Sequence, residues 1–523
     1  MKRIRALILA LSLLLSLAGC GSGDTQAPAS EQEKPSVQPQ QTTPAPSVQP
    51  SAPSQSKPKP ELPELPDTIV EPIRLSSEQA DTFDAFLAAQ RPEYELFDLY
   101  DFEATLDNWG QMPSYTPAGS GIIQDGALNR DAFRKHVQQR NAEFLTAAKG
   151  TRYTALPDDE FNKVFDIVCT GIGTLLELGV DETLLDEKLG DLKILATSMS
   201  ANGIMTHQDT ILAINLKSVE AFQNSSGEAD KFTGTVLHEV MHLGQISSDA
   251  ERAARDIAVR VGPCFQWEDV VPHALFWEWY VEGSAEHLKM DIREETVPSV
   301  YEPFVRTLDA MSVALLPTHD PAGIYQQTLN ADPEQFFALF GADTEEARIE
   351  ILNMMCALDV ALAQPDAFDA AYKDRYGKAV EDRLNYNERQ IGAASLTLSK
   401  AFYRQLCDLA EQETSLAELF SLITAYETEL ARTVRYQNNG ERNRPFIDGY
   451  NAIQTAFFEQ LAACTGMTAE DIRGQYLAWY YGEEGTALYA PHLTAERQSW
   501  LQERIDRNAE QFTRQKAICE FEP

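Results

Sequence analysis

Basic residues are scarce in this sequence. It has 43 lysines and arginines against 80 aspartates and glutamates, a formal net charge of −37 at pH 7. Neutralising the phosphates of DNA or RNA needs a basic surface, so this shortage excludes a nucleic-acid-binding role. It also argues against electrostatic adhesion to an anionic lipid surface. We expect the excess of acidic residues to form a solvated surface that keeps the protein soluble.

Cysteine pairs and long apolar runs are also missing. None of the seven cysteines lies in a Cys-x-x-Cys pair, which excludes a cysteine-rich zinc module. After the N-terminal segment, no stretch of about 18 uncharged apolar residues occurs that would cross a bilayer. The cysteines beyond Cys20 are widely spaced in mostly apolar contexts, and we expect most of them to be buried free thiols. They are Cys169, Cys264, Cys356, Cys407, Cys464 and Cys519.

The first nineteen residues have the features of a bacterial export signal. Lys2, Arg3 and Arg5 form a basic start, and the apolar run at 4–17 is too short to span a bilayer. The segment ends in Leu-Ala-Gly-Cys, which resembles a lipobox, the processing site of bacterial lipoproteins. The resemblance implies cleavage before Cys20, palmitate or other acyl chains on its thiol, and anchorage to the extracytoplasmic face of the cell membrane. The alternative is an ordinary secretory signal with a chance cysteine.

Residues 20–74 have the composition of a disordered tether. From residue 21 to 74 the chain holds 12 of its 27 prolines, much Ser, Gln and Thr, and almost no aromatic residues. Such a segment buries too little apolar surface to offset the entropy of ordering it. Its reach lies between ~40 Å for a coil and ~150 Å for a polyproline rod, enough to lift a folded domain clear of the lipid headgroups.

Most of the remaining chain has the apolar spacing of helices, with one exception. Residues 194–200 and 210–216 are short apolar and β-branched runs, and between them lies Asn202-Gly203, which favours a tight turn. We therefore expect a hairpin or small sheet in this stretch, within a mainly α fold. Helices are expected at 131–147, 158–178, 301–314, 344–363, 396–411, 415–436, 450–464 and 495–519.

The segment that carries the chemistry follows this stretch, at residues 233–245. It reads Thr-Gly-Thr-Val-Leu-His-Glu-Val-Met-His-Leu-Gly-Gln. Positions i and i+4 share a helix face, so His238 and His242 can present two imidazoles to one metal ion. Glu239 lies beside them, placed to take a proton from water. Zinc prefers such ligands and acts as a redox-inert Lewis acid, so one Zn²⁺ is the expected cofactor. The alternative is a helix with two unrelated histidines.

The residues after this motif select among the zinc peptidase groups. Metzincins require Gly at 245 and His at 248, where this chain has Gln245 and Ser248. Residues 279–286, Trp-Tyr-Val-Glu-Gly-Ser-Ala-Glu, resemble instead the second motif of the gluzincins, the group of thermolysin and membrane alanyl aminopeptidase. The resemblance implies that Glu282 is the third zinc ligand. It also implies that Glu286, one turn on, accepts a hydrogen bond from a zinc-binding histidine.

Other residues near Glu282 offer rival ligand atoms. Gly283 and Ala285 favour Glu282, because small residues at these positions let two helices approach closely. The rivals are Glu278, His273 and His287.

The resemblance further implies metal-assisted hydrolysis of a peptide bond. Glu239 is then the general base, and a Tyr or His from elsewhere stabilises the oxyanion. Tyr301, at the start of an expected helix, is the first candidate for that donor, followed by His319 and Tyr325.

The same resemblance makes residues 210–216 the edge strand to which a peptide substrate adds. His207, just before this strand, is expected to be a turn residue rather than a ligand.

These features predict a mainly α protein with a small β-sheet (α+β). The expected parts are a signal peptide at 1–19, a lipidated cysteine and tether at 20–74, a zincin-like catalytic region at 75–330 and a helical C-terminal region at 331–523. The expected function is a membrane-anchored extracytoplasmic zinc metallopeptidase acting on a peptide or protein substrate. The alternatives are a non-catalytic binding lipoprotein that retains a zincin fold, and a solute-binding lipoprotein, which would need two lobes of alternating strands and helices.

Overall fold

The computed structural model describes fourteen stretches of the chain. They are residues 67–94, 100–148, 151–206, 209–224, 226–257, 259–266, 277–295, 298, 301–319, 329, 332–363, 365–380, 382–434 and 444–481. Cys20, His207, His273, Tyr325, Cys519 and the helix expected at 495–519 lie outside them, as do the signal and most of the tether.

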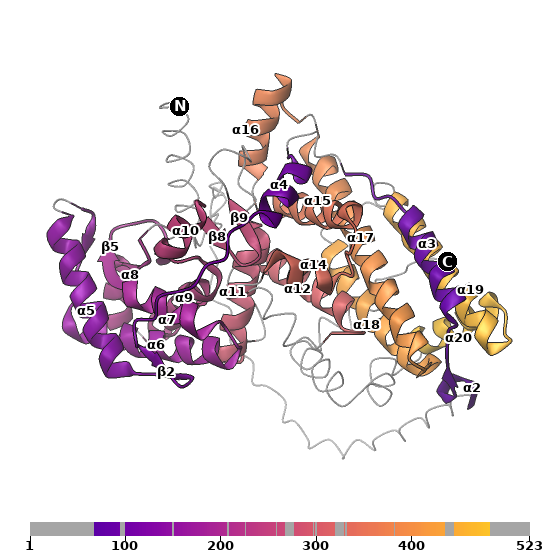
Figure 1. The fold of residues 1–523 in the computed structure, drawn as a ribbon, viewed down its shortest axis with the longest axis horizontal. Helices are drawn as coiled ribbons and strands as arrows, with labels where there is room; N and C mark the ends of the chain where they lie inside the picture. The colour runs from indigo at the N-terminus through magenta and orange to yellow at the C-terminus, as the bar shows by residue number, and fades with distance from the viewer. Residues whose placement is uncertain are drawn as a thin grey trace, which may run out of the picture.

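The protein is mainly helical, with a few small sheets, as predicted. In Figure 1 the helices form two halves that lie side by side. We call one the N-terminal half: α5 (Arg130–Ala147), α6 (Asp158–Glu177), α7 (Glu182–Asp191), α8 (Leu216–Asn224), α9 (Ser226–Gln245), α10 (Asp249–Arg255) and α11 (Glu278–Arg293). The other, the helical half, holds α12 (Glu302–Leu315), α14 (Pro333–Leu339), α15 (Glu345–Leu362), α16 (Pro365–Tyr376), α17 (Arg383–Glu411), α18 (Leu416–Val434), α19 (Arg444–Thr465) and α20 (Ala469–Tyr481). None of the described helices is long and apolar enough to cross a membrane.

The predicted helices that fall within the described residues correspond to observed ones, with α17 and α19 extending further toward the N-terminus than expected. Cys169, Cys356, Cys407 and Cys464 are free thiols, as expected for most of the cysteines.

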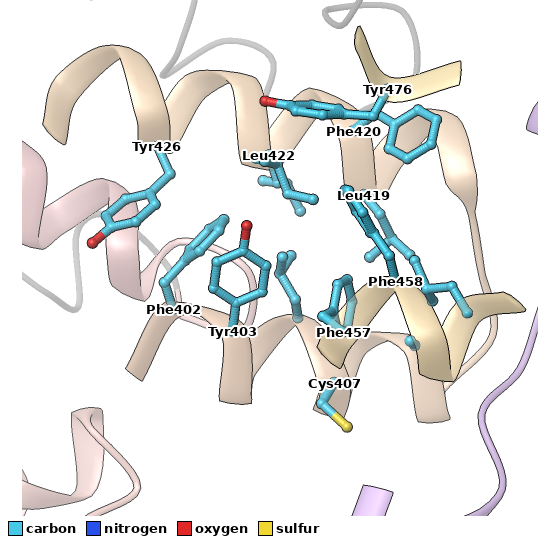
Figure 2. Close-up of a cluster of buried hydrophobic side chains, with 14 of the residues drawn as sticks. Phe402, Tyr403, Cys407, Leu419, Phe420, Leu422, Tyr426, Phe457, Phe458 and Tyr476 are labelled. Atoms are coloured by element: carbon cyan, nitrogen blue, oxygen red, sulfur yellow. The ribbon is translucent and has the colours of Figure 1, made fainter. Parts of the chain in front are cut away.

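The core of the helical half is rich in aromatic side chains. Figure 2 shows Phe402 and Tyr403 of α17, Tyr426 of α18 and Phe457 of α19 in one cluster between the helices. The rings of Phe402 and Tyr426 stack with centroids 4.2 Å apart. Large rings at helical spacing bury much apolar area per residue, which fits a bundle of long helices.

The start of the described chain belongs to this same core. Figure 1 shows the indigo helix α3 (Ser77–Ala89) against the yellow α19, far from the N-terminal half in space. The earlier residues expected as tether, 67–74, instead form α2 (Asp67–Val70) and β1 (Pro72–Ile73), which pairs with β10 (Thr414–Ser415). The tether boundary at 74 is therefore wrong. Ile69 and Ile73 are apolar and buried in the core of the helical half, and this burial outweighs the prolines around them.

A four-stranded sheet lies in the N-terminal half, with strand order β4-β5-β7-β6. Its strands are β4 (Tyr153–Thr154), β5 (Lys193–Thr197), β6 (Gly203–Thr206) and β7 (Ile211–Asn215). The small sheet is confirmed, but the hairpin of the two apolar runs is wrong. β5 and β7 pair in parallel, and β6, between them in sequence, pairs antiparallel with β7.

The edge strands of this sheet are therefore β4 and β6, and the prediction of an edge strand at residues 210–216 is wrong. β7 is buried at every position, which is typical of a central strand covered on both faces, whereas β6 alternates between buried and half-buried. Two apolar runs look alike in sequence whether they are neighbours in a hairpin or in a parallel pair, so the pattern did not distinguish the two arrangements.

The helix α9 is held against the rest of the N-terminal half by close packing on α6. A methyl group at Gly171 of α6 would lie 2.6 Å from Cγ1 of Val240 on α9. The β-branched Val240 has essentially one rotamer in a helix and cannot turn away. Gly173, two residues on, has no heavy atom within 4 Å of the same position.

These two glycines give a matched pair for testing the packing. Gly171→Ala should lower the free energy of unfolding by about 1–3 kcal/mol, because the new methyl group forces α6 and α9 apart. Gly173→Ala should raise it by up to about 1 kcal/mol, because alanine favours the helix and meets nothing. Urea denaturation of both variants measures this, and equal effects would contradict the packing described here.

Candidate metal centre

The metal-motif residues come from two helices packed against each other. His238, Glu239 and His242 lie on α9, and Glu282 and Glu286 lie on α11. Because i and i+4 lie one turn apart, each helix presents two of these side chains to the other. One ligand atom from each of His238, His242 and Glu282 lies within 4.8 Å of the other two. Both imidazoles are buried.

The spacing of these atoms fits a tetrahedral zinc site. Oε2 of Glu282 is 3.0 Å from Nε2 of His238 and 3.6 Å from Nε2 of His242. Two ligand atoms that each lie about 2.0–2.1 Å from one zinc ion are about 3.3 Å apart at the tetrahedral angle. The observed distances lie on either side of this value, and the donor set of two nitrogens and one carboxylate oxygen is one that zinc prefers.

Each imidazole is oriented by a partner on its other nitrogen. Nδ1 of His238 lies 3.2 Å from Oε2 of Glu286, the contact predicted for that glutamate. Nδ1 of His242 lies 2.7 Å from Oε1 of Gln245, whose own Nε2 donates to the carbonyl of Val281 at 3.1 Å. Such contacts fix the tautomer, so that both Nε2 atoms stay available to a metal.

Charge in the site is concentrated and mostly buried, with the side chain of Glu282 21% exposed. Burial alone would lower the pKa of His238, but its hydrogen bonds to Glu282 and Glu286 raise it to about 10. Burial would likewise raise the pKa of Glu282, but the charge of His242 and the hydrogen bond from His238 hold it far below its ordinary range. The two carboxylates thus draw positive charge onto the histidines, and the same attraction favours a divalent cation between these groups.

The ammonium group of Lys289 balances the negative charge of Glu286. Nζ of Lys289, one turn along α11, donates to Oε1 of Glu286 at 3.0 Å and contacts Glu295 at 2.8 Å. Against burial, the contacts with His238 and Lys289 lower the pKa of Glu286 to about 2. Glu286 therefore stays ionised while it holds His238.

The predicted base, Glu239, faces the edge strand β6 of the sheet. Its Oε2 accepts a hydrogen bond of 2.7 Å from the backbone N–H of Met205 on β6. Gly203 allows this approach, since a methyl group there would lie 3.1 Å from Cγ of Glu239. Burial raises the pKa of Glu239, against the lowering effect of the two histidines.

Tyr301 lies beside the metal-motif residues. Its ring stacks on that of His238, with centroids 5.8 Å apart and an interplanar angle of 19°. Tyr301 immediately precedes α12 and has a left-handed backbone, with φ 57°. α12 comes close to α11 at Gly283, where a methyl group would lie 3.0 Å from Cβ of Phe304, in keeping with the close helix approach expected there.

The other residues considered as a third ligand or as the oxyanion donor make different contacts. Nε2 of His319 donates to the carbonyl of Leu339 at 3.0 Å. His287 lies between Asp291 and Asp309, at 3.2 and 3.4 Å. Glu278 is in the first turn of α11, and the His-His-Glu cluster found among the described residues does not include it.

Three participants in the site were not predicted from the sequence. Gln245 was used only to exclude one peptidase group, although its place one turn after His242 was a usable signal. Lys289 lies one turn after Glu286, the same kind of signal. The Met205 contact joins residues 34 apart, and no local pattern indicates it.

Comparisons of the chain with protein-family models, curated proteins and solved structures find no match. What the site can do therefore rests on its own geometry and chemistry.

Gln245→Leu tests whether this side chain orients His242. It removes both hydrogen bonds of the amide at nearly constant volume, so zinc affinity should fall about 10–100-fold. Gln390→Leu is the matched control, because the buried amide of Gln390 has no hydrogen-bond partner among the described residues. It should leave zinc affinity unchanged. Competition titration with a zinc chelator measures both, and equal affinities would contradict the orienting role.

Proposed function

We propose that this chain is a zinc-dependent peptidase with a zincin-like catalytic core. The observation that carries the proposal is the convergence of His238, His242 and Glu282 at ligand distances, with Glu239 directly beside them. Three protein ligands leave one position of a tetrahedral zinc ion open, as catalytic sites require, whereas structural sites use four. The resemblance to gluzincins at residues 279–286 points to the same function.

The residues of the chain have distinct roles in this proposal. His238, His242 and Glu282 would hold the ion, which supplies a Lewis acid that activates water and polarises the scissile carbonyl. Glu239 takes a proton from the attacking water and gives it to the leaving amine. Its hydrogen bond to Met205 holds the carboxylate in place for both transfers.

Tyr301 is the proposed donor to the oxyanion. The ring of Tyr301 stacks on the imidazole of His238, one of the proposed ligands. We therefore propose that the Tyr301 hydroxyl group is the donor. A second donor at the developing charge typically contributes about 10²–10³ in rate.

The substrate is proposed to bind along β6. Asn215 N–H donates to the carbonyl of Asn202, and antiparallel pairing alternates, so the main-chain groups of Gly203 and Met205 face away from β7. The N–H of Met205 does reach Glu239 on that outer side. That N–H is already bonded to Glu239, so a peptide would pair with the other outward main-chain groups of β6 and would lie next to the proposed base.

The proposed location is the extracytoplasmic face of a cell membrane. It rests on the lipobox-like sequence at Cys20, the export signal before it and the proline-rich segment after it. Such an arrangement would place the peptidase on peptides or proteins outside the cytoplasm.

Glu239→Gln tests the proposed reaction. The variant should bind zinc as the wild type does, because Glu239 is not a ligand, while peptide cleavage falls at least about 10²–10⁴-fold with the loss of the base. Zinc is measured by elemental analysis and cleavage by mass spectrometry on an unbiased peptide library.

Glu278→Gln is the matched control, since Glu278 lies on the ligand helix outside the metal cluster. It should keep both zinc and activity. A wild-type protein without zinc, or cleavage that survives in Glu239→Gln, would refute the proposal.

A further inference from the structure

The helix that carries Glu282 begins without a cap of its own. Trp277, at the N-cap position of α11, has a left-handed backbone with φ 45° and makes no side-chain cap hydrogen bond. The first N–H groups of a helix have no acceptor within the helix. Here the first turn is buried, with Trp279 fully inaccessible, so water cannot serve as the acceptor.

Asp359, 80 residues further along the chain on α15, takes the place of the cap. Its Oδ1 accepts the backbone N–H of Trp279 at 3.1 Å, and the backbone N–H of Glu278 also donates to its carboxylate. The indole Nε1 of Trp279 donates to the carbonyl of Met355, one turn earlier on α15, at 3.1 Å. Two residues of α15, Asp359 and Met355, therefore hold the first turn of α11 by hydrogen bonds.

We propose that Asp359 is a positioning residue for the metal centre: by capping α11 from the helical half, it sets the place of Glu282. The inference rests on the proposed function. Glu282 lies one turn after Glu278, so any fraying of the first turn displaces it. On its other side the same turn is held by Gln245, which donates to Val281 and orients His242. The turn is thus fixed between α15 and α9.

The chemistry of Asp359 supports this role. It is 6% exposed, and burial raises its pKa to about 7 against the lowering effect of the Trp279 and Glu278 N–H groups. A buried carboxyl is costly, and packing alone would be served better by an apolar residue. Its hydrogen bonds to α11 give a reason for its presence at this position.

A packing role for Asp359 makes a different prediction. If the residue only stabilised α15 in the helical half, its loss would lower stability without a specific effect on the metal. Leu352, also on α15 and fully buried, supplies the comparison.

The test measures zinc affinity of the purified full chain in detergent, by chelator competition, for four variants. Asp359→Leu removes the acceptor and should weaken zinc binding about 10–100-fold. Asp359→Asn keeps a carbonyl acceptor and should stay within about threefold of the wild type. Leu352→Ala should lower the melting temperature of the metal-free protein by at least as much as Asp359→Leu, with unchanged zinc affinity. Trp279→Phe, which keeps the backbone bond and loses the indole bond, should weaken zinc binding only a few-fold.

Hydrogen exchange supplies a readout that does not need zinc. The amides of residues 279–282 should exchange at least about tenfold faster in Asp359→Leu than in the wild type, with no such change in Leu352→Ala. If the wild type binds no zinc, the proposed function fails, and exchange still decides whether Asp359 caps α11. If Asp359→Leu does not fold, Asp359→Ala, which also removes the acceptor, takes its place with the same expected results. The proposal would be overturned if, across these variants, the changes in zinc affinity and in hydrogen exchange simply followed the changes in melting temperature.

Discussion

Burial of several carboxylates in one place is the constraint on which the site depends. Glu239 and Glu286 are buried, Glu282 is 21% exposed, and all three carboxylates lie close to His238. Charges buried this way are tolerated only when they are paired and hydrogen-bonded. The two helices α9 and α11 satisfy this by facing their histidines and glutamates toward each other, which brings three possible ligand atoms within 4.8 Å of one another.

The two halves of the fold share the task of holding this arrangement. The N-terminal half provides the three proposed ligands, and the backbone N–H of Met205 on β6 holds the proposed base, Glu239. The helical half places Tyr301 on His238 and holds the start of α11 through Asp359. The helical half therefore contacts the candidate metal centre at both Tyr301 and the start of α11, although its sequence carries no metal-binding motif.

Local features of the site were predictable because helix geometry follows from sequence spacing. The i, i+4 pattern placed His238 and His242 on one face, and a single turn separates Glu282 from Glu286. Contacts between distant segments were not predictable in the same way. The parallel pairing of β5 and β7 could not be predicted, because apolar runs pair equally well in parallel or antiparallel. Asp359 lies 80 residues from Trp279, whose backbone N–H donates to it, and no local pattern indicates such a contact.

The central claim is that the two histidines and Glu282 bind one zinc ion together. X-ray absorption at the zinc edge of the zinc-loaded protein tests this most directly. The account predicts a first shell of nitrogen and oxygen atoms only, at about 2.0–2.2 Å, with scattering from two imidazoles that falls to one in His242→Gln. Sulfur in that shell, or imidazole scattering unchanged by the substitution, would contradict it.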